Sequence, residues 1–140
     1  MILDSKNLRE RDHILVAVNG TLMRGFELNS SMLALEGRFI AEAKTAPIYR
    51  MWTINDQYPA MIRDNHRGAD ITLELWEVPN NRLVTLLENE PPGLVLGWII
   101  LENGQNVLGI LGEPYLIDQG LEITHFHGWR EYLRYSRLDE

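Results

Sequence analysis

The 140-residue sequence contains no cysteine, which excludes disulfide bonds, thiolate metal sites and a cysteine nucleophile. It also contains no apolar run approaching the roughly twenty residues that a membrane-spanning helix requires. Thirteen lysines and arginines are scattered singly and are outnumbered by twenty acidic residues, for a formal charge of −7. Because a nucleic-acid surface needs clustered basic residues, neither a membrane nor a nucleic acid is an expected partner.

The composition indicates one globular domain. Hydrophobic residues make up 45% of the chain and charged residues 24%, at a length that suits a single core. Residues 1–12 are predicted to form an N-terminal arm, with Leu3 and Leu8 as its only apolar anchors. This arm is too polar for a signal peptide and too acidic for a transit peptide, so we expect a cytoplasmic protein.

The most informative segment is a strand that ends at an Asn-Gly turn. Residues Ile14 to Val18 are apolar on both faces, which predicts an interior strand. Gly20 allows the positive φ that such a turn can require. The backbone amides of the turn can converge on a carboxylate or phosphate, although the same dipeptide is also typical of an ordinary hairpin without a ligand.

Periodicity and turn residues predict the remaining elements. Strands are expected within 38–55, interrupted at Thr45-Ala46-Pro47, and at 58–62, 70–78, 94–101 and 106–111. The strand at 70–78 alternates, which predicts one face on the core. Short helices are expected at 27–35, after residue 80, and near the C-terminus, where Thr124 is predicted to cap a helix with Trp129, Tyr132 and Leu133 facing the core. The class is therefore α+β, with a mixed, mostly antiparallel, barrel-like sheet.

Two family resemblances support this class. The strand and turn VNGTLMRG resemble the YGTL-type signature of γ-glutamylcyclotransferase-like folds, with Asn19 in place of the usual aromatic residue. Blocks in the same order also resemble the C-terminal domain of allophanate hydrolase, which has that fold. They are Leu28-Asn29, Gly37-Arg38-Phe39, Thr45 to Arg50, Glu74 to Pro79, Gly109 to Tyr115, Ile123-Thr124 and Gly128-Trp129-Arg130. Residues 1–140 are accordingly expected to form a single γ-glutamylcyclotransferase-like domain.

The resemblance to cyclotransferases implies a reaction. These enzymes convert a γ-glutamyl amide to 5-oxoproline and a free amine, without a metal or organic cofactor, when the substrate's α-amine attacks its γ-carbonyl. The protein must supply a carboxylate pocket, an oxyanion donor and a proton-shuttling carboxylate. The resemblance assigns substrate binding to the amides of Asn19, Gly20, Thr21 and Leu22, and adds Tyr115 from a region near the site.

Glu90 falls on the catalytic position of that family. It ends the stretch Leu86-Leu87-Glu88-Asn89-Glu90, with Pro91 where a glycine usually follows. Enclosure by Trp98 or Trp76 would raise the pKa of Glu90 by desolvation and suit it to acid/base work. The alternative is a solvated carboxylate at a helix end. This position is usually apolar in allophanate hydrolase domains, so Glu90 favours cyclotransferase chemistry.

Two other functions follow from the allophanate hydrolase resemblance. One is a non-catalytic, stand-alone accessory domain that binds an amidase or forms a homodimer. The other is decarboxylation of an N-carboxylated carbamate released by an amidase. The second is less favoured, because such domains are expected to carry a histidine in the first turn, where this chain has Leu22.

Three further side chains could carry chemistry. Arg50 lies among bulky residues and is predicted to form a buried structural ion pair with Glu74 or Glu113, with substrate binding as the alternative. His125 and His127 lie on one side of an extended segment but lack a third metal ligand, so we expect loop or helix-entry residues and no metal site.

Overall fold

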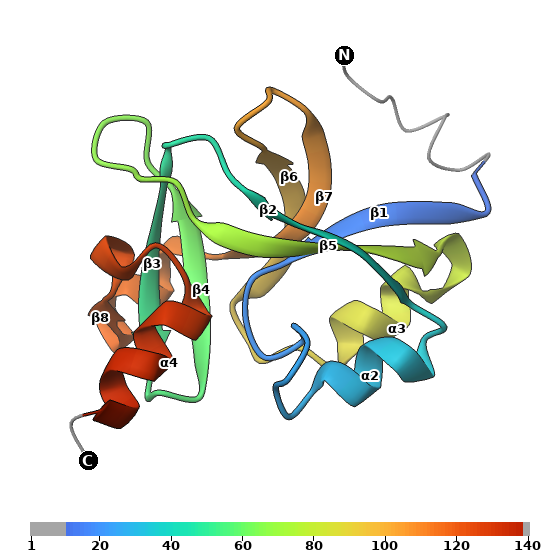
Figure 1. Ribbon diagram of the computed structural model, residues 1–140, viewed down its shortest axis with the longest axis horizontal. Coiled ribbons are helices and arrows are strands. Elements are labelled where there is room, and N and C mark those ends of the chain that lie inside the picture. Colours follow the sequence, from blue (N-terminus) through green and yellow to red (C-terminus); the bar gives the residue numbers. More distant parts are fainter. Residues whose placement is uncertain (1–10, 139–140) are drawn as a thin grey trace.

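The computed structural model describes residues 11–138 (Figure 1). Most of the predicted arm at 1–12, including Leu3 and Leu8, lies outside the described residues. Five strands form one sheet in the order β2-β5-β1-β7-β6, and three form a second in the order β4-β3-β8. The strands are β1 (His13–Val18), β2 (Arg38–Lys44), β3 (Tyr49–Ile54), β4 (Tyr58–Arg63), β5 (Thr72–Pro79), β6 (Leu94–Ile100), β7 (Asn106–Gly112) and β8 (Leu121–Glu122).

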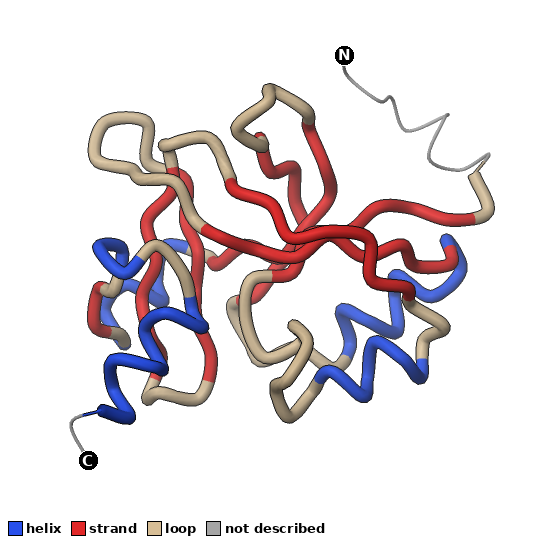
Figure 2. The backbone as a smooth tube through the Cα atoms, in the orientation of Figure 1, coloured by secondary structure: helices blue, strands red, loops and turns tan. Residues whose placement is uncertain are grey.

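Short helices accompany the two sheets. They are α2 (Asn29–Ala34), α3 (Leu83–Glu88) and α4 (Trp129–Leu138), with 3-10 helices at Asn80–Arg82, Pro114–Gln119 and Thr124–Phe126. In Figure 1, α2 and α3 lie together below the five-stranded sheet, and α4 lies beside β3 and β4. Figure 2 shows the loops that join the strands. Within residues 11–138 no helix is long and apolar enough to cross a membrane.

The expected α+β class with a mostly antiparallel sheet is confirmed. Among the named strands, only β1 and β7 are neighbours with parallel pairing. Strand β1 has β5 on one side and β7 on the other, so the interior strand predicted from its apolar run is also confirmed. Val16 and Ala17 are completely buried at its centre.

The prediction that one face of β5 lies on the core is confirmed, but the opposite face is buried as well. Leu73 and Leu75 are buried, but so are Glu74 and Trp76 on the opposite face. That face is covered because the loop after β1 and the start of α4 both send arginines to Glu74. A polar-apolar alternation therefore did not mean a solvated face here.

The predicted helix cap at Thr124 is wrong. Thr124 begins a 3-10 helix, and α4 starts at Trp129. The Thr124 hydroxyl accepts a hydrogen bond from the Met51 N–H at 2.9 Å and donates to Glu122 at 2.7 Å, so it joins β3 to the segment after β8. The predicted inward face of α4 is confirmed, because Trp129 is buried and Tyr132 and Leu133 pack against the core.

Candidate active site

Glu90 and the turn after β1 line one small pocket. Its enclosed volume is about 20 Å³, room for about one water molecule, within about 280 Å³ of space that includes open solvent. Four regions of the chain form it. They are the end of β1 with its turn, the start of β4, the segment from Glu90 to the start of β6, and one residue of β7. The lining residues are Val18, Asn19, Gly20, Thr21, Leu22, Tyr58, Pro59, Glu90, Leu94 and Ile110. The fold thus brings five of the six predicted site residues together.

The turn that lines this pocket has unused backbone donors. A hydrogen bond of 3.0 Å from the Met23 N–H to the Gly20 carbonyl closes the turn. Within residues 11–138, the N–H groups of Gly20, Thr21 and Leu22 donate to no protein acceptor. Three such groups on one concave turn can bind an anion.

Gly20 is required by close packing and not by its backbone angle. The φ angle of Gly20 is not positive, so the prediction that the turn needs a glycine for a positive φ is wrong. A Cβ atom at Gly20 would lie 2.6 Å from Cδ of Pro59 in β4. The absence of a side chain therefore lets the turn approach the opposite pocket wall.

Hydrogen bonds to three elements, β7, α2 and β5, hold the turn in place. The Asn19 amide donates to the Ile110 carbonyl at 2.9 Å, and the Asn29 amide donates to the Leu22 carbonyl at 2.8 Å. The Arg24 N–H donates to Glu74 at 3.0 Å. Because the Asn19 side chain is 3% exposed and already bonded, any contact of Asn19 with a ligand falls to its backbone.

Glu74 is the buried centre of this support. Its carboxylate accepts side-chain hydrogen bonds from Arg24 at 3.2 Å, Trp76 at 3.0 Å and Arg130 at 3.1 Å, in addition to the Arg24 backbone N–H. Arg130 also donates to the Arg24 carbonyl at 3.0 Å. A fully partnered buried carboxylate of this kind ties β5, the turn and α4 together. The sequence did not identify Glu74 in this role.

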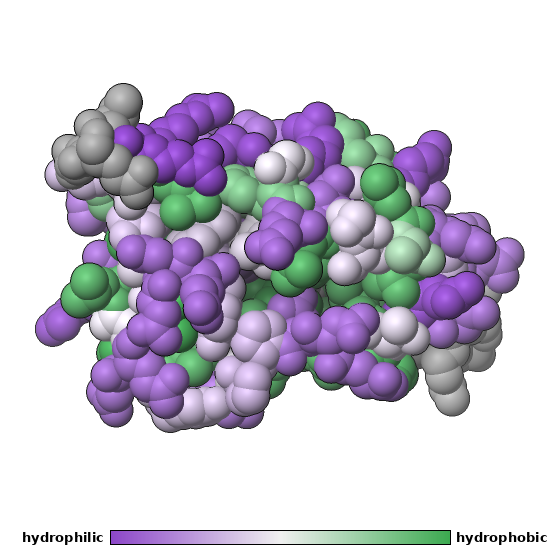
Figure 3. All heavy atoms as spheres, turned by 90° about the horizontal axis from the view of Figure 1, so that it is seen from below, coloured by the Kyte–Doolittle hydropathy of each residue, from purple (hydrophilic) through white to green (hydrophobic). Residues whose placement is uncertain are grey.

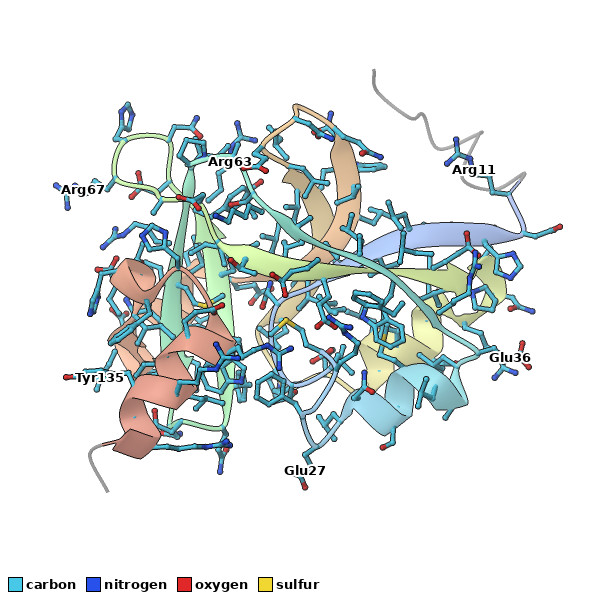
Figure 4. The ribbon with its side chains drawn as sticks, in the orientation of Figure 1. Arg11, Glu27, Glu36, Arg63, Arg67 and Tyr135 are labelled. Carbon is cyan, nitrogen blue, oxygen red and sulfur yellow. The ribbon has the colours of Figure 1, made fainter. Side chains whose placement is uncertain are left out.

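Glu90 has a different environment. It follows α3, and its backbone N–H donates to the Leu87 carbonyl at 3.1 Å. Within the described residues its carboxylate has no ion pair or hydrogen-bond partner. Burial raises its pKa from 4.5 to about 7. By contrast, Glu27 and Glu36, on either side of α2, point away from the molecule (Figure 4).

The residues that enclose Glu90 are not the predicted tryptophans. The pocket walls include Tyr58, Leu94 and Ile110. Trp76 instead donates to Glu74, and Trp98 is 41% exposed beside a separate groove. Both tryptophans lie on strands whose order in the sheet could not be derived from sequence spacing.

Two tyrosines lie at this end of the molecule. Tyr58, which the sequence reasoning missed, lines the pocket, and its position directly before Pro59 was the available signal. Tyr115, which was predicted, is not among the lining residues. Its hydroxyl lies close to Gly93, in the segment that follows Glu90. A Cβ atom added to Gly93 would lie 2.8 Å from that hydroxyl. Burial raises the pKa of Tyr58, with a smaller contribution from the charge of Tyr115.

The remaining candidates lie elsewhere. The predicted partners of Arg50 are wrong: it pairs with Glu122 at 2.7 Å and with Asp64 at 3.2 Å, joining β3 to β8 and to the turn after β4. His125 stacks on Phe126. The described residues contain no group of three or more His, Cys, Asp or Glu that could hold a metal ion.

Comparison with solved structures identifies similar chains. Protein c4763 from uropathogenic E. coli is 45% identical, with a TM-score of 0.86, covering 88% of this chain and 97% of that one. The aig2-like protein (ggact) from Mus musculus is 20% identical, with a TM-score of 0.58, covering 79% and 86%. The second similarity shows the fold alone.

Curated relatives are much longer proteins. The urea amidolyase of Lachancea kluyveri is 22% identical over 99% of this chain, but the match covers 8% of that protein. A family model described as the allophanate hydrolase C-terminal domain matches residues 14–134. The chain therefore belongs to the allophanate hydrolase C-terminal domain family.

Proposed function

We propose that the pocket converts a small γ-glutamyl amide to 5-oxoproline and a free amine, with Glu90 as the general acid/base. The observation that carries this proposal is a half-buried carboxyl group without a counter-charge in the same pocket as three unused backbone N–H groups. The amides of Gly20, Thr21 and Leu22 bind the substrate carboxylate or the developing oxyanion.

In this reaction Glu90 moves one proton. The substrate's unprotonated α-nitrogen attacks its γ-carbonyl carbon, and neutral Glu90 donates its proton to the leaving nitrogen as the original amide bond breaks. The Glu90 carboxylate then accepts the proton that the attacking nitrogen loses. With a pKa of about 7, Glu90 is present in both protonation states near neutral pH, so it can do both.

A panel of γ-glutamyl amides tests this function, with 5-oxoproline measured by mass spectrometry. Turnover is expected for at least one member of the panel. Glu90→Gln should lower kcat/KM by about 100-fold or more, because general acid/base catalysis contributes about that much. The matched control is Glu88→Gln, an exposed carboxylate two residues earlier, which should keep full activity. No turnover across the panel, or an active Glu90→Gln variant, would contradict the proposal.

Family membership favours a second candidate, a role beside an amidase. The curated relatives are named urea amidolyases, and this chain matches only a small part of them. This role has two forms. As an accessory domain, the protein binds an amidase. As a decarboxylase, protonated Glu90 donates its proton to the nitrogen of an N-carboxylated carbamate as carbon dioxide leaves. An amidase that acts on allophanate, mixed with this protein, tests it. Faster carbon dioxide release than with the amidase alone, lost in Glu90→Gln, indicates decarboxylation, and co-elution without faster release indicates an accessory domain.

A further inference from the structure

The pocket around Glu90 lacks a compensating positive side chain. Its lining contains Tyr58 and Glu90 as titratable groups and, among residues 11–138, no lysine, arginine or histidine. Arg24 is near in sequence but is bonded to Glu74 and lies 3.5 Å above the ring of Phe39. An anion in the pocket therefore has neutral donors, the backbone N–H groups and the hydroxyls of Thr21 and Tyr58, but no positive side chain to balance its charge.

The segment from Glu88 to Leu94 adds no cation. Glu88 is exposed on α3, and the Tyr115 hydroxyl lies against Gly93. The Glu113 backbone N–H donates to the Gly93 carbonyl at 2.7 Å. With no cation beside it, an ionised Glu90 would repel any anion held by the turn. The repulsion is strong because apolar walls at Leu94 and Ile110 screen charge poorly.

From this arrangement we infer that the pocket is selective for ligands with a single carboxylate and takes up one proton, at Glu90, when such a ligand binds. The inference deepens the proposed function, on whose site it rests. The three amides of the turn hold the one negative charge, and neutral Glu90 faces the rest of the ligand. A ligand with a second carboxylate places two or three negative charges in an apolar pocket without a cation. The N-carboxylated carbamate of the second candidate is such a dianion.

Two ligands of nearly equal shape test the charge selectivity. Glutaramate carries one carboxylate and one amide, and glutarate carries two carboxylates. At pH 7, isothermal titration calorimetry should show glutaramate binding at least tenfold more tightly than glutarate. Equal affinities, or no glutaramate binding at millimolar concentration, would overturn the inference.

The pH dependence tests the proton. Because Glu90 titrates near pH 7, the affinity for glutaramate should fall about tenfold between pH 6 and pH 8. Titrations at pH 8 in buffers of different ionisation enthalpy should show uptake of close to one proton. Glu90→Gln should bind with a pH-independent affinity and no proton uptake, whereas Glu88→Gln should behave as the unmodified protein. A pH-independent affinity in the unmodified protein, or pH dependence that survives in Glu90→Gln, would contradict the inference.

These measurements separate the inference from the proposed reaction. Glutaramate binding with proton uptake, but no formation of 5-oxoproline from any γ-glutamyl amide, rejects only the reaction. Formation of 5-oxoproline with a KM that does not change between pH 6 and pH 8 rejects only the inference.

Discussion

Two carboxylates inside this protein have opposite surroundings. Glu74, on β5, is 1% exposed and accepts hydrogen bonds from two arginines and a tryptophan. Glu90, after α3, is half-buried at the pocket and has no charged or hydrogen-bonding partner among the described residues. The comparison teaches that burial alone does not identify a reactive acid. A partnered carboxylate supports structure, whereas an unpartnered one is free to exchange a proton with a ligand.

Removal of the charge at Glu74 should have the largest effect on stability. Glu74→Gln places an amide donor against Arg24 and Arg130, and loss of one partner from a buried ion pair costs about 3 kcal/mol. Urea unfolding measures this loss. Glu77→Gln is the matched control on the same strand. Its salt bridge with Arg38 is exposed, so it should cost about 0.5 kcal/mol or less. Equal losses in the two variants would contradict the role assigned to Glu74.

Glu90 should instead make stability depend on pH. Its folded pKa of about 7 lies above the ordinary value of 4.5, so its contribution is complete below pH 4.5 and is lost as the pH rises through 7. Each pKa unit corresponds to about 1.4 kcal/mol of unfolding free energy. Because solvent at the open side of the pocket weakens the effect, we expect a loss of roughly 2 to 3 kcal/mol.

Unfolding free energies from pH 4.5 to pH 8 measure that loss. The Glu90→Gln variant should lose less stability across this range than the unmodified protein and should be the more stable of the two at pH 8. The Glu88→Gln variant should follow the unmodified protein. Parallel pH profiles for the unmodified protein and Glu90→Gln would mean that Glu90 is solvated.

Gly20→Ala should disturb the Glu90 pocket without touching the Glu74 cluster. The new Cβ would meet the rigid ring of Pro59, and such overpacking costs about 2 kcal/mol. Ligand binding should be lost, because the turn must move away from β4. Thr21→Ala keeps every backbone N–H and serves as the control, with binding close to that of the unmodified protein. Calorimetric titration with glutaramate distinguishes the two variants.

Asn29→Ala should have the smallest effect of the series. It removes the hydrogen bond to the Leu22 carbonyl, which is worth about 1 kcal/mol, and leaves both carboxylates intact. We expect a several-fold higher KM with little change in kcat, because the turn amides lose alignment. Ser30→Ala, at the exposed neighbouring position, should change neither value. A KM equal to that of the unmodified protein would show that the other anchors of the turn suffice.

Much of the fold could be predicted from local patterns. Strands β1, β6 and β7, the interruption at Pro47, and the turn at Gly104 follow from apolar runs and turn residues. The second buried face of β5 could not be predicted, because its cover comes from Arg24 and Arg130, far away in sequence. Figure 3 shows hydrophobic and hydrophilic residues intermixed on the underside of the molecule. Local sequence patterns do not predict which residues lie on this surface.

The candidate site was predicted less completely. The family resemblance named Glu90 and residues 19–22, and the structure places them on one pocket. Tyr58 was missed and Tyr115 lies outside the lining, because the side chains at a pocket depend on how β4 and the segment before β6 approach the turn. Arg50 was given the wrong partners for the same reason: Glu122 becomes its neighbour only through the pairing of β3 with β8.

The amino-acid sequence by itself determined the α+β class, the order of the strands along the chain, the turn at Asn19-Gly20 and the family. These depend on hydrophobic periodicity, turn residues and blocks of sequence, all of which are local. Only the tertiary structure decided that Glu74 is partnered and Glu90 is not. The ionisation of a buried carboxylate depends on desolvation and on charges brought close by folding, and no spacing along the chain determines those distances.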